Sequence, residues 1–109
     1  MTKVGEGNQV PLPPNYQEQL EGYLRQFQGA LVAYQKGDSA QKAHLKGVMD
    51  QVLLLIRSAV KEMKQPGMMK QETLVETDYQ AYMKNDSAQN FSKLGEDLTT
   101  LHDYNQLHE

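Results

Sequence analysis

The side chains best suited to chemistry in this chain are three histidines: His44, His102 and His108. The chain contains no cysteine, which excludes disulfides, thiolate zinc sites and cysteine catalysis. His102 and His108 are six residues apart, so on a helix they point in different directions, whereas shared metal ligands need a spacing of three or four. No Glu-x-x-His pair occurs, which argues against the di-iron class of helical bundle. We therefore expect surface histidines and no metal site.

Motifs for catalysis and for nucleotide binding are missing from the sequence. No serine lies in a nucleophile elbow, and no phosphate-binding loop occurs. Gly5-Glu6-Gly7 matches part of a dinucleotide-binding pattern, but it follows no predicted strand and lacks the third glycine. The sequence therefore predicts a protein that is not an enzyme and has no cofactor.

The first motif that could bind a partner lies near the amino terminus. Pro13-Pro14-Asn15-Tyr16 fits the pattern Pro-Pro-x-Tyr, which resembles ligands that WW domains bind through a preformed polyproline helix. The interpretation we favour is structural, because prolines before an Asn cap stiffen the start of a helix. Docking through Pro13, Pro14 and Tyr16 would require that Tyr16 does not pack into the bundle.

The second candidate is a group of methionines, Met63, Met68 and Met69, around Pro66-Gly67. Methionine is flexible and polarizable, and it is common on surfaces that accept varied apolar partners. Core filling is the more usual role. The functional hypothesis is that this end of the molecule binds an amphipathic helix of another protein.

The overall composition indicates one folded domain with a very polar surface. The chain has 109 residues and a net charge of −3, with 39% apolar residues and a mean hydropathy of −0.71. The basic residues are scattered among acidic ones, so nucleic acid is not an expected partner. The longest apolar run, residues 52–56, is far shorter than the ~20 residues that span a bilayer. Without an apolar leader we expect a cytoplasmic protein that is not in a membrane, and leaderless secretion stays open.

Apolar residues recur with helical spacing along most of the chain, and no segment alternates with the period of a strand. Residues 1–14 lack this periodicity and are predicted to be a flexible tail. The predicted helices cover residues 15–36, 39–65, a segment that begins late at a Thr73–Glu76 capping box, and 87–107. In the second helix, Leu53 and Leu54 widen the apolar stripe. A helix apolar on most sides is surrounded by others, so we expect this one at the centre.

A repeated nonapeptide predicts how these helices connect. Residues 33–41 and 81–89 agree at seven of nine positions, 48 residues apart. In each copy a Lys and then Gly37 or Asn85 suit a left-handed helix end. Asp38 and Asp86 follow, and each is expected to cap the next helix, with Gln41 and Gln89 completing capping boxes. Short turns of this kind make neighbouring helices antiparallel, so the repeat favours a structural device over two ligand sites.

The same turns carry a resemblance to a known class. Gly37-Asp38 and Asn85-Asp86, with Pro66-Gly67 as the middle linker, are similar to the turns of small four-helix export chaperones of flagellar and type III systems. That resemblance implies a small helical protein that binds another protein.

Together these observations predict an all-α fold, an antiparallel four-helix bundle made of two hairpins, within a single domain at residues 15–109. A three-helix bundle, in which the last two helices fuse through Asn85, is the alternative. The expected function is a non-enzymatic interaction module, an adaptor or an export-chaperone-like protein, which can also form homo-oligomers. The alternative function is a self-assembling structural or secreted subunit that docks to host proteins through its Pro-Pro-x-Tyr tail.

Overall fold

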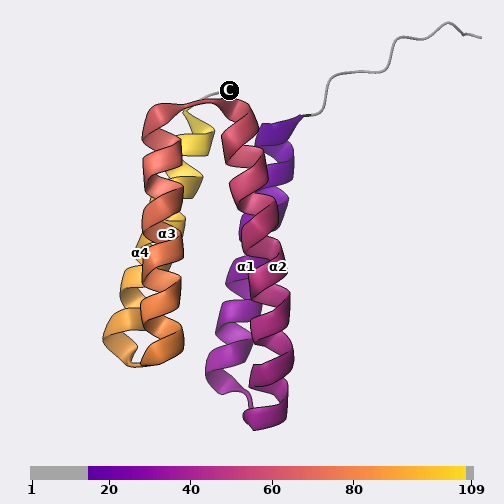
Figure 1. The fold of residues 1–109 in the computed structure, drawn as a ribbon, viewed down its shortest axis with the longest axis vertical. Helices are drawn as coiled ribbons and strands as arrows, with labels where there is room; N and C mark the ends of the chain where they lie inside the picture. Colours follow the sequence, from indigo (N-terminus) through magenta and orange to yellow (C-terminus); the bar gives the residue numbers. More distant parts are fainter. Residues whose placement is uncertain (1–14, 108–109) are drawn as a thin grey trace, which may run out of the picture.

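A computed structural model describes residues 15–107, and within this range four α-helices and no strands occur. They are α1 (Tyr16–Lys36), α2 (Ser39–Met63), α3 (Pro66–Lys84) and α4 (Ala88–Gln106). Consecutive helices run antiparallel, and the α1–α2 hairpin lies beside the α3–α4 hairpin (Figure 1). The predicted all-α bundle of two hairpins is therefore confirmed, and the three-helix alternative is wrong. The predicted tail at residues 1–14 lies outside the described residues, as does His108.

The turn between α1 and α2 follows the predicted capping chemistry. The Asp38 carboxylate accepts a hydrogen bond from the Gln41 amide at 2.9 Å, and the Gln41 side chain accepts one from the Asp38 amide at 3.0 Å. Gly37 has a φ of −83°, so the predicted left-handed conformation is absent there. The chain reverses through extended backbone instead.

The turn between α3 and α4 uses a different cap from the one predicted. Ser87 is the N-cap and accepts from the Asn90 amide at 3.1 Å. Asp86, predicted to be the cap, instead forms an ion pair with Lys42 on α2 at 3.1 Å. Asn85 has a φ of −149°, so it too is extended and not left-handed. The repeated sequence therefore closes two turns with different hydrogen bonds.

The left-handed backbone conformation predicted for Gly37 and Asn85 occurs instead in the turn between α2 and α3. Lys64 has a φ of 58° and a ψ of 37°, which is the left-handed helix-ending conformation. Pro66 starts α3 as its first residue, a position where its missing amide costs no hydrogen bond. The predicted late start of the third helix is wrong, because Thr73 lies within α3 and its hydroxyl donates to the Met69 carbonyl at 3.1 Å.

The core is completed where the two hairpins meet. Phe27 on α1 packs edge-on against Tyr79 on α3, with ring centroids 5.4 Å apart. Tyr34 packs in the same way on Tyr82, at 5.8 Å. Below 2% exposure the core side chains are Leu20, Phe27, Met49, Ile56, Val60, Met68, Val75, Tyr79, Tyr82, Leu94, Leu98 and Leu101. All four helices contribute to it.

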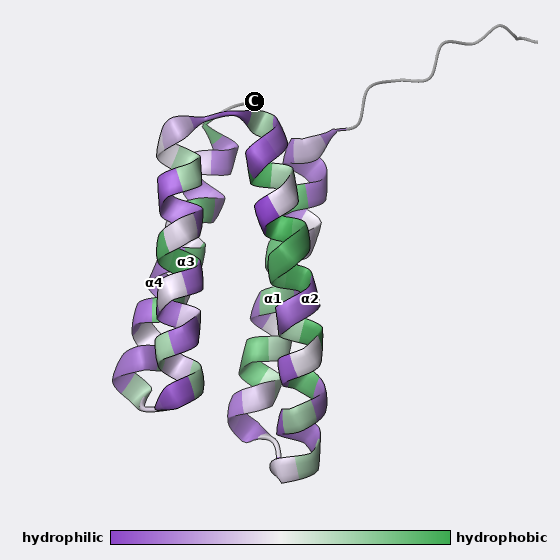
Figure 2. Cartoon of the chain, viewed as in Figure 1, coloured by the Kyte–Doolittle hydropathy of each residue, from purple (hydrophilic) through white to green (hydrophobic). Residues whose placement is uncertain are grey.

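Helix α2 is not buried on most sides, which corrects the sequence prediction. Val52, Leu53 and Ile56 are buried, but Leu54 and Leu55 are 58% and 44% exposed. The most hydrophobic stretch of the chain lies in the middle of α2 (Figure 2). Among the described helices it packs against α1 and α3, and none of them covers its outer side.

A reciprocal clasp joins the first turn of α1 to the last turn of α4. The Gln17 side chain donates to the Asn105 carbonyl, and the Asn105 side chain donates to the Gln17 carbonyl, both at 2.9 Å. Asn105 also donates to Glu21 at 2.8 Å, and the Nδ1 of His102 lies 2.6 Å from the Glu21 carboxylate. Because Asn105 is fully buried, these bonds fix how the hairpins meet at this end.

The two copies of the repeat give a test of the observed caps. Asp38→Ala should lower the free energy of unfolding by about 1 kcal/mol, since it removes an N-cap hydrogen bond, and Ser87→Ala should cost a similar amount. Asp86→Ala removes an exposed ion pair and should cost less, about 0.5 kcal/mol. Urea denaturation followed by circular dichroism measures all three. A larger cost for Asp86→Ala than for Ser87→Ala would contradict the cap assignment.

Candidate functional site

The three methionines of the sequence hypothesis do not share one surface. Met68 is fully buried in the core, Met63 is half-buried against it, and Met69 is 42% exposed. Met68 therefore has the core-filling role, and only Met69 of the three is mostly available to a partner. A methionine-rich docking surface at this end of the bundle is not what the structure presents.

Tyr16 is the first residue of α1, and its half-buried side chain packs against the core. Pro13 and Pro14 lie outside the described residues. A Pro-Pro-x-Tyr ligand needs a tyrosine that can enter the partner's groove, so this packing argues against docking through Tyr16. Asn15 caps α1 by accepting from the Glu18 amide at 3.0 Å, as the structural interpretation of this motif predicted.

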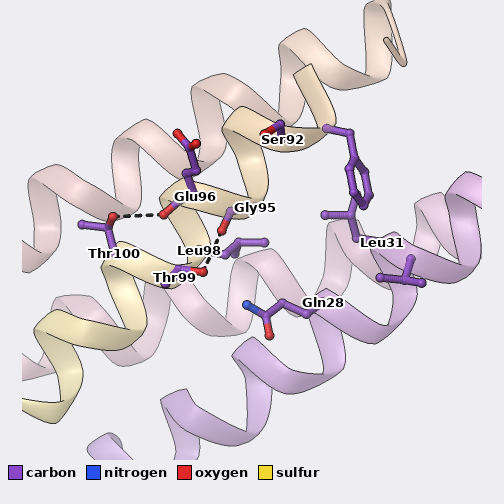
Figure 3. Close-up of a pocket in the computed structure, with 10 residues that line it drawn as sticks. Gln28, Leu31, Ser92, Gly95, Glu96, Leu98, Thr99 and Thr100 are labelled. Carbon is purple, nitrogen blue, oxygen red and sulfur yellow. Dashed lines mark hydrogen bonds between the residues drawn. The ribbon is translucent and has the colours of Figure 1, made fainter. Parts of the chain in front are cut away.

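A groove with a volume of about 740 Å³ lies between α1 and α4. Figure 3 shows Gln28 and Leu31 reaching it from α1, opposite Gly95, Leu98 and Thr99 on α4. The full lining is Gln28, Leu31, Val32, Phe91, Ser92, Gly95, Glu96, Leu98, Thr99 and Thr100. We call these residues the α1–α4 groove. Its apolar side chains come from both hairpins.

Small residues on α4 open this groove. Ser92, Gly95 and Thr99 follow one another at spacings of three and four, so they lie on one side of the helix. Space is free around Gly95, where an added Cβ would meet no heavy atom within 4 Å. Thr99 donates its hydroxyl to the Gly95 carbonyl at 3.0 Å, as Figure 3 shows, so this hydroxyl needs no other partner. The side of the groove formed by α4 therefore has short side chains and is only weakly polar.

The groove continues toward the clasp. A second hollow of about 310 Å³ shares Gln28 and Thr99 with it and extends to Arg25, Glu21 and His102. Together the two hollows follow α1 from Val32 back to Glu21, a distance of about 16 Å at 1.5 Å per residue. That length corresponds to three turns of a helix.

A polar cluster lies on the other side of the bundle, at the contact between α2 and α3, which we call the α2–α3 seam. Arg57 binds both carboxylate oxygens of Glu76, with its Nε 2.8 Å from Oε2. Glu72 lies one turn earlier on α3 and is 4% exposed. Burial, together with a hydrogen bond and repulsion from Glu76, raises the pKa of Glu72 to about 8. Arg57 lowers the pKa of Glu76, so the proton resides on Glu72.

A second pair of carboxyl groups lies between α3 and α4. Burial and the nearby Asp78 raise the pKa of Asp97 to about 7. Asp78 is 7% exposed and lies 3.6 Å from the ammonium group of Lys93. The Gln71 side chain donates to the Asp97 carbonyl at 3.0 Å and links the same two helices. Helix α3 therefore carries carboxyl groups on both of its packed sides.

The described part of the chain contains neither a cluster of metal ligands nor a membrane-spanning helix. From residue 15 to residue 107, no group of three or more acidic or histidine side chains is arranged to hold a metal ion. Of the helices in that range, none is long and apolar enough to cross a membrane. His44 is exposed and His102 is paired with Glu21.

No protein-family model, curated protein or solved structure matches this chain. Function must therefore be inferred from the geometry of the α1–α4 groove and of the carboxyl clusters.

The carboxyl pairs predict how stability depends on pH. The folded protein holds the protons of Glu72 and Asp97 more tightly than the unfolded chain, whose ordinary values are 4.5 and 3.8. Their stabilising effect is complete below those values and is lost as pH rises through about 8 and about 7. Each group contributes at most about 1.4 kcal/mol per pH unit, and Asp97 less, because solvent screens it.

The free energy of unfolding should therefore fall as pH rises from 5 to 8. Glu72→Gln and Asp97→Asn should each reduce this slope, because neither amide titrates. Urea denaturation at several pH values measures the slope, and an unchanged slope in the double variant would contradict the assignment. Glu76 and Asp50 have lowered pKa values, so their titration changes the free energy of unfolding in the opposite direction and below this pH range.

Proposed function

We propose that this protein is a non-enzymatic binding module that holds an amphipathic helix of another protein in the α1–α4 groove. The observation that carries this proposal is the groove itself. Apolar side chains from both hairpins line it, and Gly95 leaves open space on its α4 side. An adaptor or a chaperone-like partner of another protein would use such a surface. An amphipathic helix binds a groove through apolar residues at positions i, i+3, i+4 and i+7.

The dimensions of the groove support a helix as its occupant. Its two walls, α1 and α4, are antiparallel helices, and the hollow follows them for about three turns. A third helix laid along them would bury Val32, which is 44% exposed, and Phe91, which is half-buried. Small residues at helix contacts let backbones approach closely, and Ser92, Gly95 and Thr99 supply them here.

The charge of the groove favours a partner with a basic residue beside its apolar face. Glu96 is the charged residue among the ten that line the larger hollow, and it is exposed. A lysine or arginine of the bound helix would pair with Glu96 at the rim. Rim charges of this kind contribute specificity and association rate more than affinity.

A synthetic 18-residue peptide of Leu, Ala and Lys, with one apolar face, tests this function. In a titration followed by amide NMR shifts, the largest changes should occur at Gln28, Val32, Gly95 and Thr99. Gly95→Leu fills the groove and should weaken binding by about tenfold or more. Glu96→Gln should weaken binding of this peptide but not of its Lys-to-Gln version.

The control for Gly95→Leu is Gly47→Leu, because Gly47 is also a helical glycine with no heavy atom within 4 Å of an added Cβ. It lies on the outer side of α2, so its substitution should leave peptide binding unchanged. Equal weakening in both variants, or shifts centred on α2, would contradict a site in the α1–α4 groove.

Self-association is a second candidate function, and the outer side of α2 favours it. Gly47, Gln51, Leu54 and Ser58 are all exposed and form an uncharged stripe at spacings of four, three and four. A two-fold interface brings the same surface of two copies together, so an uncharged stripe meets itself without repulsion.

The self-association candidate predicts that the chain forms dimers at high concentration. Replacing Leu54 and Leu55 by Gln should shift the protein to monomers with little change in the stability of the monomer, because both side chains are already exposed. Sedimentation velocity over a range of concentrations measures this. A monomer at all concentrations would remove the candidate.

A further inference from the structure

Glu72 is a buried carboxyl group with an unused hydrogen-bonding atom. It is 4% exposed, and its Oε2 has no hydrogen-bond partner among the described residues. Glu72 lines a hollow of about 240 Å³ between α2 and α3. The other residues around it are Arg57, Val60, Lys61, Met69, Thr73 and Glu76. A carboxyl group in this place is costly to ionise, because burial removes its hydration.

In the structure as it stands, the neighbouring charges do not offset the cost of ionising Glu72. Arg57 already binds both oxygens of Glu76, so its donors are directed at that residue. Glu76 places a second negative charge beside Glu72 on the same helix. Lys61 is the other cation that lines the hollow, and it is exposed, so it can meet a carboxylate only near the surface.

We propose that Glu72 is a proton-binding site that controls the contact between the two hairpins. When Glu72 is neutral, α3 lies against α2 as the structure shows. When it ionises, the carboxylate leaves the buried seam for water and Lys61, and α3 moves away from α2. This proposal does not depend on the proposed helix-binding function, and it concerns the opposite seam of the bundle.

The links between the two hairpins show what such a movement must break. At one end, Gln65 alone separates Lys64, which ends α2 in the left-handed conformation, from Pro66, which begins α3. At the same end the buried clasp of Gln17 and Asn105 holds α1 to α4. Toward the far end, the Tyr79 hydroxyl donates to Asp50 on α2 at 2.6 Å, and Lys42 forms an exposed ion pair with Asp86. Movement of α3 away from α2 there breaks both links, of which the exposed ion pair is the weaker.

Distance measurements between two spin labels test the proposal directly, because the chain has no native cysteine to interfere. Ala43→Cys on α2 and Lys84→Cys at the end of α3 place labels at exposed positions near the free ends of the hairpins. At pH 6 one short distance should dominate. As pH rises from 6 toward 8 a longer distance should appear, its ratio to the short one should rise by up to tenfold per pH unit, and it should level off above about pH 8.

Glu72→Gln keeps the shape of the neutral acid and cannot ionise, so the labelled variant should keep the short distance at every pH. Asp97→Asn is the matched control: it removes the other carboxyl group with a raised pKa and should leave the transition in place. Circular dichroism at each pH checks that all variants remain helical.

Three results would overturn the proposal. The first is a short distance that persists in the unsubstituted labelled protein at pH 9.5. The second is a transition that survives Glu72→Gln. The third is carboxyl carbon NMR showing that Glu72 stays protonated while the distance changes, because the opening would then have another cause.

Discussion

The contact between the two hairpins is the constraint on which the rest of this structure depends. Each hairpin by itself exposes a row of large apolar side chains, and burying them is worth about 1.5–3 kcal/mol per side chain. The packing of Phe27 on Tyr79 and of Tyr34 on Tyr82 joins α1 to α3 across the middle of the bundle. The α1–α4 and α2–α3 seams lie on either side of this packing. Both candidate sites are in those seams.

The helices and their inward faces could be predicted from the sequence, because apolar spacing reports directly on which side is buried. The reciprocal cap of Asp38 and Gln41 was also predictable, since both residues are local. The second copy of the motif was misleading because a cap depends on competing partners. Asp86 has Lys42 within reach from α2, and Ser87 supplies the cap instead. Leu54 was predicted to be buried because composition does not reveal how many neighbours a helix has.

The α1–α4 groove could not be predicted from one segment, because its walls lie more than fifty residues apart in the sequence. A local signal existed in Ser92, Gly95 and Thr99, which place small residues on one side of an amphipathic helix. The methionines illustrate a related limit of sequence analysis. Met68 and Met69 are adjacent, and consecutive residues on a helix point about 100° apart, so one enters the core and the other faces water. Clustering in sequence does not produce a shared surface on a helix.

The two seams are coupled if both proposals hold, because both involve the position of one hairpin relative to the other. A helix bound in the α1–α4 groove would lie against Val32 on one hairpin and Phe91 on the other. It would therefore bind best to one spacing of the hairpins, and the proton on Glu72 favours the closed spacing. Equilibrium linkage is reciprocal. If protonation of Glu72 raises the affinity for a partner that prefers the closed form, binding of that partner must raise the proton affinity of Glu72 by the same factor. A groove formed within a single hairpin would have no such dependence.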